Sequence, residues 1–164
     1  MITREQVFAA LGDVMDPEVP VLSVVELGIV RDAVVSEDGA RVTVTITPTY
    51  SGCPAMHEIE SDLRAALVAA GAGAVDVKTV LAPAWTTDWM GAAAREKLRA
   101  WGIAPPGRAA ADGLITLTHR RSPVACPFCG SANTRLQSGF GSTACKAIHV
   151  CGECRQPFDE FKAF

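Results

Sequence analysis

The stretch GIVRDAVVSEDGARVTVTIT, residues 28–47, carries the clearest structural pattern in the first part of this chain. Residues 28–36 and 41–47 are rich in β-branched residues, which are common in strands. Between them, Glu37-Asp38-Gly39-Ala40 supplies the residue types of a tight turn. The pattern predicts a β-hairpin.

Helical patterns lie on both sides of this hairpin. Thr3 begins a capping-box pattern for a first helix that ends before Pro17, and residues 16–27 read as a loop or broken helix. The strongest helical pattern follows Pro54 and ends at Gly71, with apolar residues on one face and acids mostly off it. A strand over 75–81 and a helix over 87–101 are predicted next.

This order of elements predicts an α+β fold in which a small mixed sheet carries its helices on one face. We expect this domain to span residues 1–102. Prolines, glycines and alanines dominate residues 103–113, which we interpret as a linker. Residues 114–164 then form a small C-terminal module, in which 114–118 are expected to be a strand.

Composition excludes several classes of protein. The 164 residues are 49% hydrophobic and 20% charged, which is ordinary for globular proteins. No window is apolar enough to span a membrane, and the start Met1-Ile-Thr-Arg-Glu5 has an acid where a signal peptide needs apolar residues. We therefore expect a cytoplasmic protein.

Charge divides the chain unevenly. Residues 1–113 hold 9 Lys and Arg against 15 Asp and Glu, whereas residues 114–164 hold 6 against 3. Phosphate binding requires clustered cations, so the acidic first part disfavours nucleic acid as a partner.

Five of the six cysteines lie in the C-terminal module, and four of them form two C-x2-C pairs 21 residues apart. This interval slightly exceeds the roughly 15 to 20 residues of a four-thiolate zinc ribbon. Each pair can present two sulfurs to one tetrahedral ion, and we predict a structural zinc site of Cys126, Cys129, Cys151 and Cys154.

Two alternatives remain for these thiols. Disulfides are disfavoured in a chain expected to stay in a reducing compartment. An iron-sulfur cluster is the more serious alternative, because spacing does not name the metal. Cys145 and His149 are further candidate ligands, although the two complete pairs leave them no vacancy.

Cys53 is the lone cysteine of the first domain and directly precedes Pro54, at the expected start of a helix. The positive end of a helix dipole can lower a thiol pKa there and favour a thiolate that contacts a metal or cluster. An inert buried thiol is equally compatible with the sequence. A Cys-His hydrolase using His57 is a weak alternative. Asp16, Glu18 and Glu26 are possible oxygen ligands.

Four segments of the first domain resemble the SufT-like iron-sulfur assembly family over about residues 1–102. They are Asp16-Pro-Glu18, Leu27-Gly-Ile-Val30, Thr47-Pro-Thr-Tyr-Ser-Gly-Cys-Pro54 and the Trp85 segment. With the tail segments Cys126-Pro-Phe-Cys-Gly130, Phe140-Gly-Ser-Thr-Ala-Cys-Lys-Ala147 and Cys151-Gly-Glu-Cys-Arg-Gln-Pro-Phe158, the chain resembles the PaaD family of phenylacetate-degradation proteins.

The resemblance implies a role with the multicomponent oxygenase that epoxidises the ring of phenylacetyl-CoA. It implies a cluster or metal contact at Cys53, with Asp16, Glu18 and Thr47 as further candidates. No motif of a di-iron, flavin or nicotinamide enzyme is present. We therefore expect no independent catalytic activity.

The hypothesis is an accessory maturation factor that helps to insert an iron-sulfur cluster or iron into a partner subunit of the oxygenase. Cys53 would be its exchangeable ligand, and the zinc module would hold the client. A purely structural, protein-binding subunit is the main competitor, and a zinc-ribbon nucleic-acid binder is a remote one. A homodimer remains open.

Overall fold

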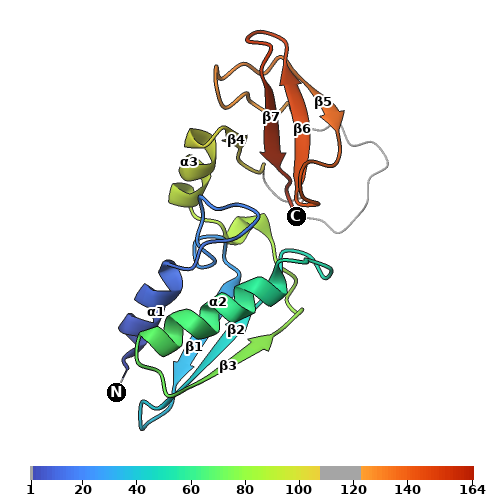
Figure 1. Ribbon diagram of the computed structural model, residues 1–164. Coiled ribbons are helices and arrows are strands. Elements are labelled where there is room, and N and C mark those ends of the chain that lie inside the picture. The colour runs from blue at the N-terminus through green and yellow to red at the C-terminus, as the bar shows by residue number, and fades with distance from the viewer. Residues whose placement is uncertain (1, 108–122) are drawn as a thin grey trace. The chain divides into compact units, whose positions relative to one another are not determined.

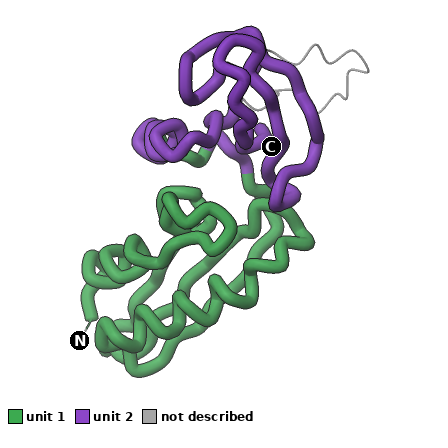
Figure 2. The backbone as a smooth tube through the Cα atoms, turned by 45° about the horizontal axis from the view of Figure 1, so that its top comes forward, with its two compact units in different colours: residues 1–85, 89–91 green, residues 86–88, 92–164 purple. Residues whose placement is uncertain are grey.

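The computed structural model describes residues 2–107 and 123–164, which form two compact units (Figure 2). The first unit contains the described residues up to Trp85, together with Trp89–Gly91. The second contains Thr86–Asp88 and the described residues from Ala92 to Phe164.

The first unit is built on a mixed three-stranded sheet in the order β1-β2-β3 (Figure 1). Strands β1 (Val30–Val35) and β2 (Arg41–Ile46) are antiparallel, which confirms the predicted hairpin. Strand β3 (Ala74–Thr79) runs parallel to β2. A parallel neighbour requires a crossover connection, and helix α2 (Met56–Ala69) supplies it.

Helices α1 (Arg4–Gly12) and α2 cover one face of this sheet, as predicted (Figure 1). The predicted capping box of α1 is present, since Gln6 N–H donates to Thr3 Oγ1 at 3.3 Å and Thr3 N–H donates to Gln6 Oε1 at 2.9 Å. The core between helices and sheet consists of side chains with no exposed surface: Val7, Leu11, Val42, Val44, Ile46, Ile59, Leu63 and Leu67. Because α2 spaces its buried residues by four, one apolar stripe meets the alternating inward residues of β2.

The prediction of a single helix over residues 87–101 is wrong. The structure has a short 3₁₀ turn over Thr87–Trp89 and then helix α3 over Ala92–Ala100. Gly91 lies at the interruption, where its weak helix propensity offers little resistance to a break. The guanidinium of Arg95 donates to Thr87 O at 2.8 Å, so the side chain of α3 binds a carbonyl that a continuous helix would have used.

The second unit contains a four-stranded sheet in the order β4-β7-β6-β5. Its strands are β4 (Ile103–Ala104), β5 (Thr134–Ser138), β6 (Lys146–Cys151) and β7 (Pro157–Phe161). Residues 103 and 104, expected in the linker, pair with Asp159 and Glu160 of β7. Helix α3 and β4 therefore group with the C-terminal unit, and the boundary between compact units lies earlier in the chain than residue 102. The remaining expected linker residues from 108 and the strand expected over 114–118 lie outside the described residues.

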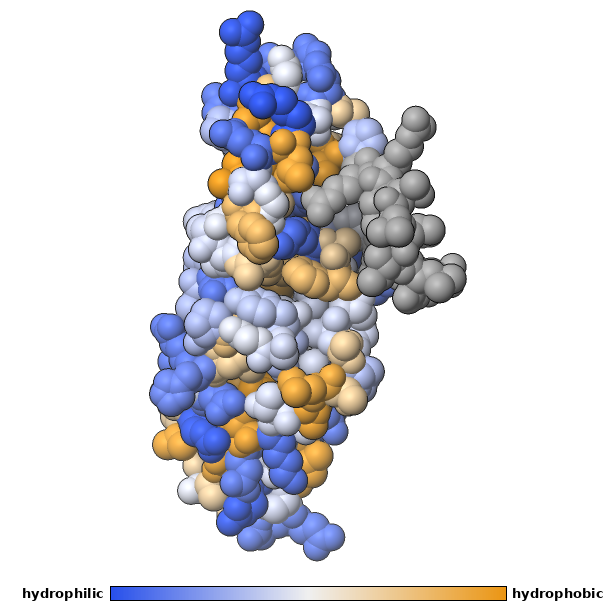
Figure 3. All heavy atoms as spheres, turned by 90° about the vertical axis from the view of Figure 1, so that its right-hand side faces the viewer, coloured by the Kyte–Doolittle hydropathy of each residue, from blue (hydrophilic) through white to orange (hydrophobic). Residues whose placement is uncertain are grey.

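Apolar side chains appear at the surface among hydrophilic ones on the face drawn in Figure 3. Large exposed hydrophobic residues of the second unit include Trp101, Phe128 and Phe140, with 64%, 57% and 72% of their surface accessible. Within the described part of the chain, no helix has the length and apolarity needed to traverse a lipid bilayer.

Candidate metal centre and cysteine loop

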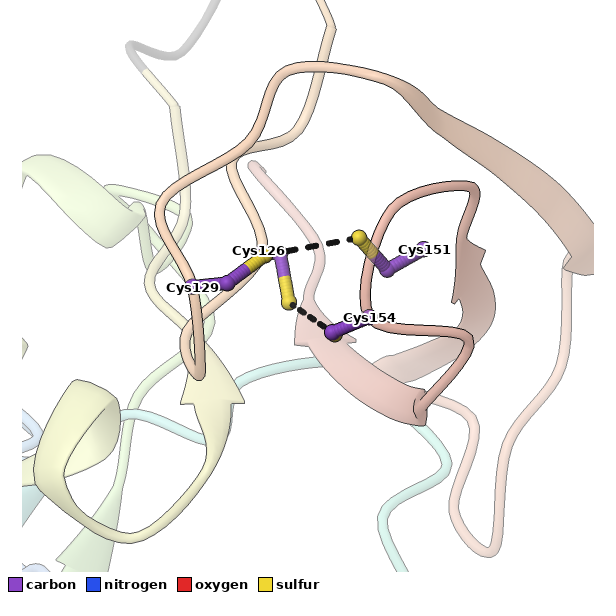
Figure 4. Close-up of side chains that lie close together, drawn as sticks. All are labelled: Cys126, Cys129, Cys151 and Cys154. Atoms are coloured by element: carbon purple, nitrogen blue, oxygen red, sulfur yellow. Dashed lines mark hydrogen bonds between the residues drawn. The ribbon is translucent and has the colours of Figure 1, made fainter.

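Two tight turns bring four sulfurs together in the second unit. The first knuckle, residues 126–130, precedes β5, and the second knuckle, residues 151–155, joins β6 to β7. All four Sγ atoms lie within 4.8 Å of one another. Figure 4 shows the sulfurs of opposite knuckles pointing toward each other, with 3.6 Å between Cys126 and Cys154 and between Cys129 and Cys151.

These distances fit one tetrahedral ion. Zn–S bonds of about 2.3 Å place the sulfurs of a tetrahedral site about 3.8 Å apart. The donor set is entirely thiol, which suits zinc or iron rather than hard cations such as magnesium. Among the described residues, only these four cysteines form a group of three or more potential metal ligands.

The knuckle backbones turn through left-handed conformations. Gly130 ends the first knuckle with φ 75°, and its N–H donates to Cys126 O at 2.9 Å. Arg155 occupies the corresponding place in the second knuckle with φ 61°. Glycine therefore accommodates the left-handed turn in the first knuckle, whereas the second holds a non-glycine residue in a conformation that L-residues disfavour.

The pKa values of Cys151 and Cys154 are shifted in opposite directions. The backbone N–H of Cys154 lowers the pKa of Cys151 to about 7, and the N–H of Glu153 acts in the same direction. The N–H of Gln156 lowers the pKa of Cys154, but desolvation and hydrogen bonds with the other thiols raise it to about 12. Four neighbouring thiols cannot all ionise without a cation, so metal binding must release protons.

Cys126 and Cys151 are buried, Cys154 is half-buried and Cys129 is exposed. Phe158 and Ala104 pack with the two buried ligands in one apolar cluster. The site is therefore supported by the ribbon core on one side and reachable by solvent on the other.

Cys145 and His149, the two extra candidate ligands, lie outside the group of four. Cys145 is buried, with its sulfur 3.0 Å from Thr143 Oγ1. His149 is also buried, and its Nε2 lies 2.7 Å from Glu160 Oε2 while its ring stacks on Phe158. The pairing with Glu160 orients the imidazole within the sheet.

The second candidate site is the cysteine loop, residues 47–55, which connects β2 to α2. It lies at the end of the sheet where the parallel strands β2 and β3 finish, an arrangement that commonly gathers functional loops in α/β proteins. Thr47 N–H donates to Ile29 O at 2.8 Å, which ties the loop to the chain entering β1.

Cys53 is half-buried in this loop, and its surroundings oppose ionisation. Burial raises the pKa of the Cys53 thiol, and the charges of Glu18 and Asp16 raise it further. The N–H of Ala55 and the side chain of Tyr50 bond to the sulfur and act in the opposite direction. The charges of Asp16 and Glu18 therefore act on Cys53, although these three residues do not form one of the groups of potential metal ligands among the described residues.

The expectation that a helix end lowers the pKa of Cys53 is wrong, because the net shift is upward. Helix α2 begins at Met56 with Ala55 as its N-cap, so Cys53 lies before the cap itself. The favourable N–H contact is present, but burial and the two acids outweigh it.

Asp16 is 5% exposed, and its carboxylate stabilises a turn. Its Oδ1 accepts hydrogen bonds from Glu18 N–H at 2.8 Å and Val19 N–H at 2.7 Å, which closes the turn that presents Glu18. Glu26 similarly accepts from Ser23 N–H at 3.0 Å. These acids are built into turns rather than simply solvated.

Thr47 is 1% exposed, and its hydroxyl oxygen has no hydrogen-bond partner in the described structure. A buried hydroxyl without a partner is unfavourable, so this atom needs an explanation beyond stability. Tyr50 was not singled out by the sequence. The signal available was its position three residues before Cys53, where the turn bond from Cys53 N–H to Tyr50 O measures 3.2 Å.

Two tryptophans anchor the neighbouring segment. Trp85 is buried, and its Nε1 donates to Leu27 O at 3.0 Å. Gly28 has φ 74°, and a Cβ there would lie 3.0 Å from the Cβ of Trp89, so glycine is required twice over. His57 is exposed on α2, and no hydrogen bond between it and Cys53 occurs in the described structure.

Comparison with known proteins matches both units. A family model described as an iron-sulfur cluster assembly protein matches residues 4–80, and one described as the PaaD zinc beta ribbon domain matches residues 110–162. A crystal structure of a domain of unknown function, DUF59, from Bacillus anthracis is 31% identical, with TM-score 0.53, over 58% of this chain and 90% of that chain. A conserved hypothetical protein from Thermotoga maritima is 36% identical, with TM-score 0.51, over 59% and 94%.

These matches and the geometry of the sulfurs identify an iron-sulfur assembly domain followed by a metal-binding zinc ribbon. The chain is 46% identical over 157 residues to an Escherichia coli K12 protein whose name describes it as a subunit of a "Putative 1,2-phenylacetyl-CoA epoxidase", covering 96% of this chain and 91% of that protein. The chain belongs to the PaaD family. It is also 37% identical over 89 residues to a Porphyromonas gingivalis protein named "Fe-S protein maturation auxiliary factor", covering 54% of this chain and 83% of that protein.

Proposed function

We propose that this protein is an accessory subunit and maturation factor of a multicomponent phenylacetyl-CoA epoxidase. It helps to insert iron or an iron-sulfur cluster into a partner subunit of that complex. Cys53 is the exchangeable ligand, assisted by Asp16, Glu18 and Thr47. The four-cysteine site holds zinc, and the ribbon unit that it stabilises holds the client.

The single observation that carries this proposal is the half-buried Cys53 thiol, whose pKa is raised by burial and by the charges of Glu18 and Asp16 from a separate turn. Negative charges near a thiol disfavour a free thiolate, yet thiolate and carboxylate are both donor types that an iron cation accepts. The unpartnered hydroxyl of buried Thr47, in the same loop, supports it.

The chemistry of exchange follows from the raised pKa of Cys53. At neutral pH the resting side chain is a thiol, and cationic cargo displaces the thiol proton to solvent when it binds. On release the proton returns, so the sulfur does not remain as an exposed nucleophile. One thiolate with two carboxylates also holds cargo less tightly than four closed thiolates, which favours transfer.

Co-expression of the partner oxygenase with Cys53→Ser protein tests the proposal. The substitution nearly preserves side-chain volume, so both units should stay folded, while iron and acid-labile sulfide per oxygenase should fall. Ser51→Ala, an exposed change in the same loop, is the matched control and should load the partner normally. A fully loaded oxygenase obtained with Cys53→Ser would refute the delivery role.

The raised pKa also favours one competitor, a purely structural subunit whose Cys53 is an inert thiol. That alternative predicts stoichiometric co-purification with the oxygenase and no effect of Cys53→Ser on iron content. Delivery instead predicts anaerobic iron binding that depends on Cys53 and a loss of partner iron in Cys53→Ser. Metal analysis of the purified wild type and variant separates the two.

A further inference from the structure

Hydrogen bonds other than those of the sulfurs connect the two knuckles, and Asn133 lies at their centre. On the side of the first knuckle, Cys126 N–H donates to Ser131 O at 3.0 Å. Asn133 N–H in turn donates to Ser131 Oγ at 3.0 Å. Asn133 is thereby linked through one residue to a buried ligand.

On the other side, Asn133 contacts the second knuckle directly. Gly152 N–H donates to Asn133 O at 2.7 Å, and Asn133 Nδ2 donates to Glu153 Oε1 at 3.0 Å. Gly152 and Glu153 are the two residues between the ligands Cys151 and Cys154. The backbone and side chain of Asn133 therefore bind the segment that sets the spacing of those sulfurs.

Gly152 provides an independent indication that this contact is specific. Its φ does not lie in the left-handed region, unlike that of Gly130, so backbone conformation does not demand glycine here. Instead, a Cβ at this position would lie 2.6 Å from Asn133 Nδ2 and 2.8 Å from Asn133 Cγ. The Asn133 amide therefore occupies the space that a side chain at residue 152 would need.

We infer that Asn133 is a positioning residue that holds the second knuckle against the first, and so sets how tightly and how long the four-cysteine site retains its metal. The metal-free ribbon must bring together two knuckles that are far apart in the sequence. A hydrogen bond that aligns them before the metal binds reduces the conformational entropy lost on binding. Groups that orient metal ligands typically change affinity by about 10- to 100-fold when removed. This inference concerns the retained ion and is independent of the delivery role of Cys53.

The test uses the full-length protein, titrated with Co²⁺ and with Zn²⁺ against a competing chelator. In Asn133→Asp, the donor to Glu153 becomes a second carboxylate that repels it. Because this bond is exposed and the backbone bond from Gly152 stays, metal affinity should fall only several-fold. Metal release to chelator should accelerate correspondingly. Gly152→Ala should reproduce this loss by displacing the amide, whereas Gln137→Ala, an exposed change on β5, should leave affinity unchanged.

Rescue separates positioning from general damage to the fold. The double variant Asn133→Asp with Glu153→Gln exchanges donor and acceptor and restores one hydrogen bond, so it should recover most of the affinity and the wild-type Co²⁺ absorption spectrum. Glu153→Gln alone keeps an acceptor oxygen and should bind nearly normally. Unchanged affinity in Asn133→Asp, or failure of the double variant to recover, would overturn the inference. If Asn133→Asp does not fold, the Gly152→Ala titration decides it in the same way.

Discussion

The two sulfur sites of this protein differ in the number of thiols that they gather. In the knuckles, four sulfurs lie within 4.8 Å of one another, and hydrogen bonds lower the pKa of Cys151 to about 7 while they and desolvation raise that of Cys154 to about 12. In the cysteine loop, burial and two carboxylates raise the pKa of the solitary Cys53. The contrast shows how one chain can separate retention from exchange: many aligned ligands hold an ion, while a single thiol among opposing charges keeps its proton until cargo arrives.

Removal of a buried knuckle ligand should produce the largest effect. Cys151→Ser is expected to lose the metal and unfold the second unit while the first unit stays folded. A structural zinc site contributes about 10 to 16 kcal/mol of apparent binding free energy, as much as or more than the whole stability of many domains. Metal content per chain and NMR spectra of both units measure this. A native ribbon in Cys151→Ser protein would remove the contrast with Cys53→Ser.

The two knuckle ends should respond oppositely to substitution. Gly130→Ala places a Cβ in a left-handed conformation and should destabilise the metal-loaded ribbon by about 1 to 2 kcal/mol. No atom lies within 4 Å of that Cβ, so the loss reports backbone strain alone. Arg155→Gly relieves the same strain and should be neutral or slightly stabilising. Denaturant unfolding of the loaded protein measures both, and equal losses would contradict the assignment of strain to Arg155.

Thr47→Val should separate stability from binding in the cysteine loop. The methyl group replaces a buried hydroxyl that has no partner, so the first unit should become about 1 kcal/mol more stable. Anaerobic iron binding should nevertheless weaken if the hydroxyl serves the cargo, as we propose. Urea unfolding and iron titration of the same preparation provide the two readouts. A loss of stability would show that Thr47 is an ordinary core residue.

The smallest expected effect is electrostatic. Glu18→Gln removes a charge that raises the pKa of Cys53, so the thiolate fraction at pH 8 should increase. Alkylation should accelerate by less than about tenfold, which corresponds to one pKa unit. In both proteins the rate should fall as the pH falls, with the variant's profile displaced toward lower pH. Iodoacetamide kinetics followed by mass spectrometry would record it, and Glu58→Gln, an exposed change on α2, is the matched control. Identical pH profiles of alkylation in the wild type and Glu18→Gln would show that Glu18 does not act on Cys53.

Local patterns predicted most of the first unit correctly. The hairpin over 28–47, the capping box at Thr3 and the amphipathic helix before Gly71 depend on residues close in sequence, and all three are present. The helix over 87–101 failed because Gly91 allows a break that a contact to Arg95 then stabilises. Strand β4 could not be foreseen, because its partner strand β7 lies more than fifty residues later.

The same distinction between local and long-range determinants applies to the candidate sites. Two C-x2-C pairs are short enough to predict a four-sulfur cluster, and the structure places those sulfurs together. For Cys53, the sequence supplied a helix start and hence the wrong sign of the pKa shift. Burial and the charges of Glu18 and Asp16, which belong to a turn far away in the sequence, decide that sign, and neither is a local property.

The amino-acid sequence was sufficient to predict the hairpin and the helix that crosses over it, because periodicity acts over a few residues. Ligand spacing likewise predicted the four knuckle ligands, and short motifs indicated the family. Only the tertiary structure decided the direction of the pKa shift of Cys53, the grouping of α3 and β4 with the ribbon unit, and the packing of Asn133 against Gly152. Each of these depends on burial or on pairing between segments far apart in the chain, whose energies exist only once the chain has folded.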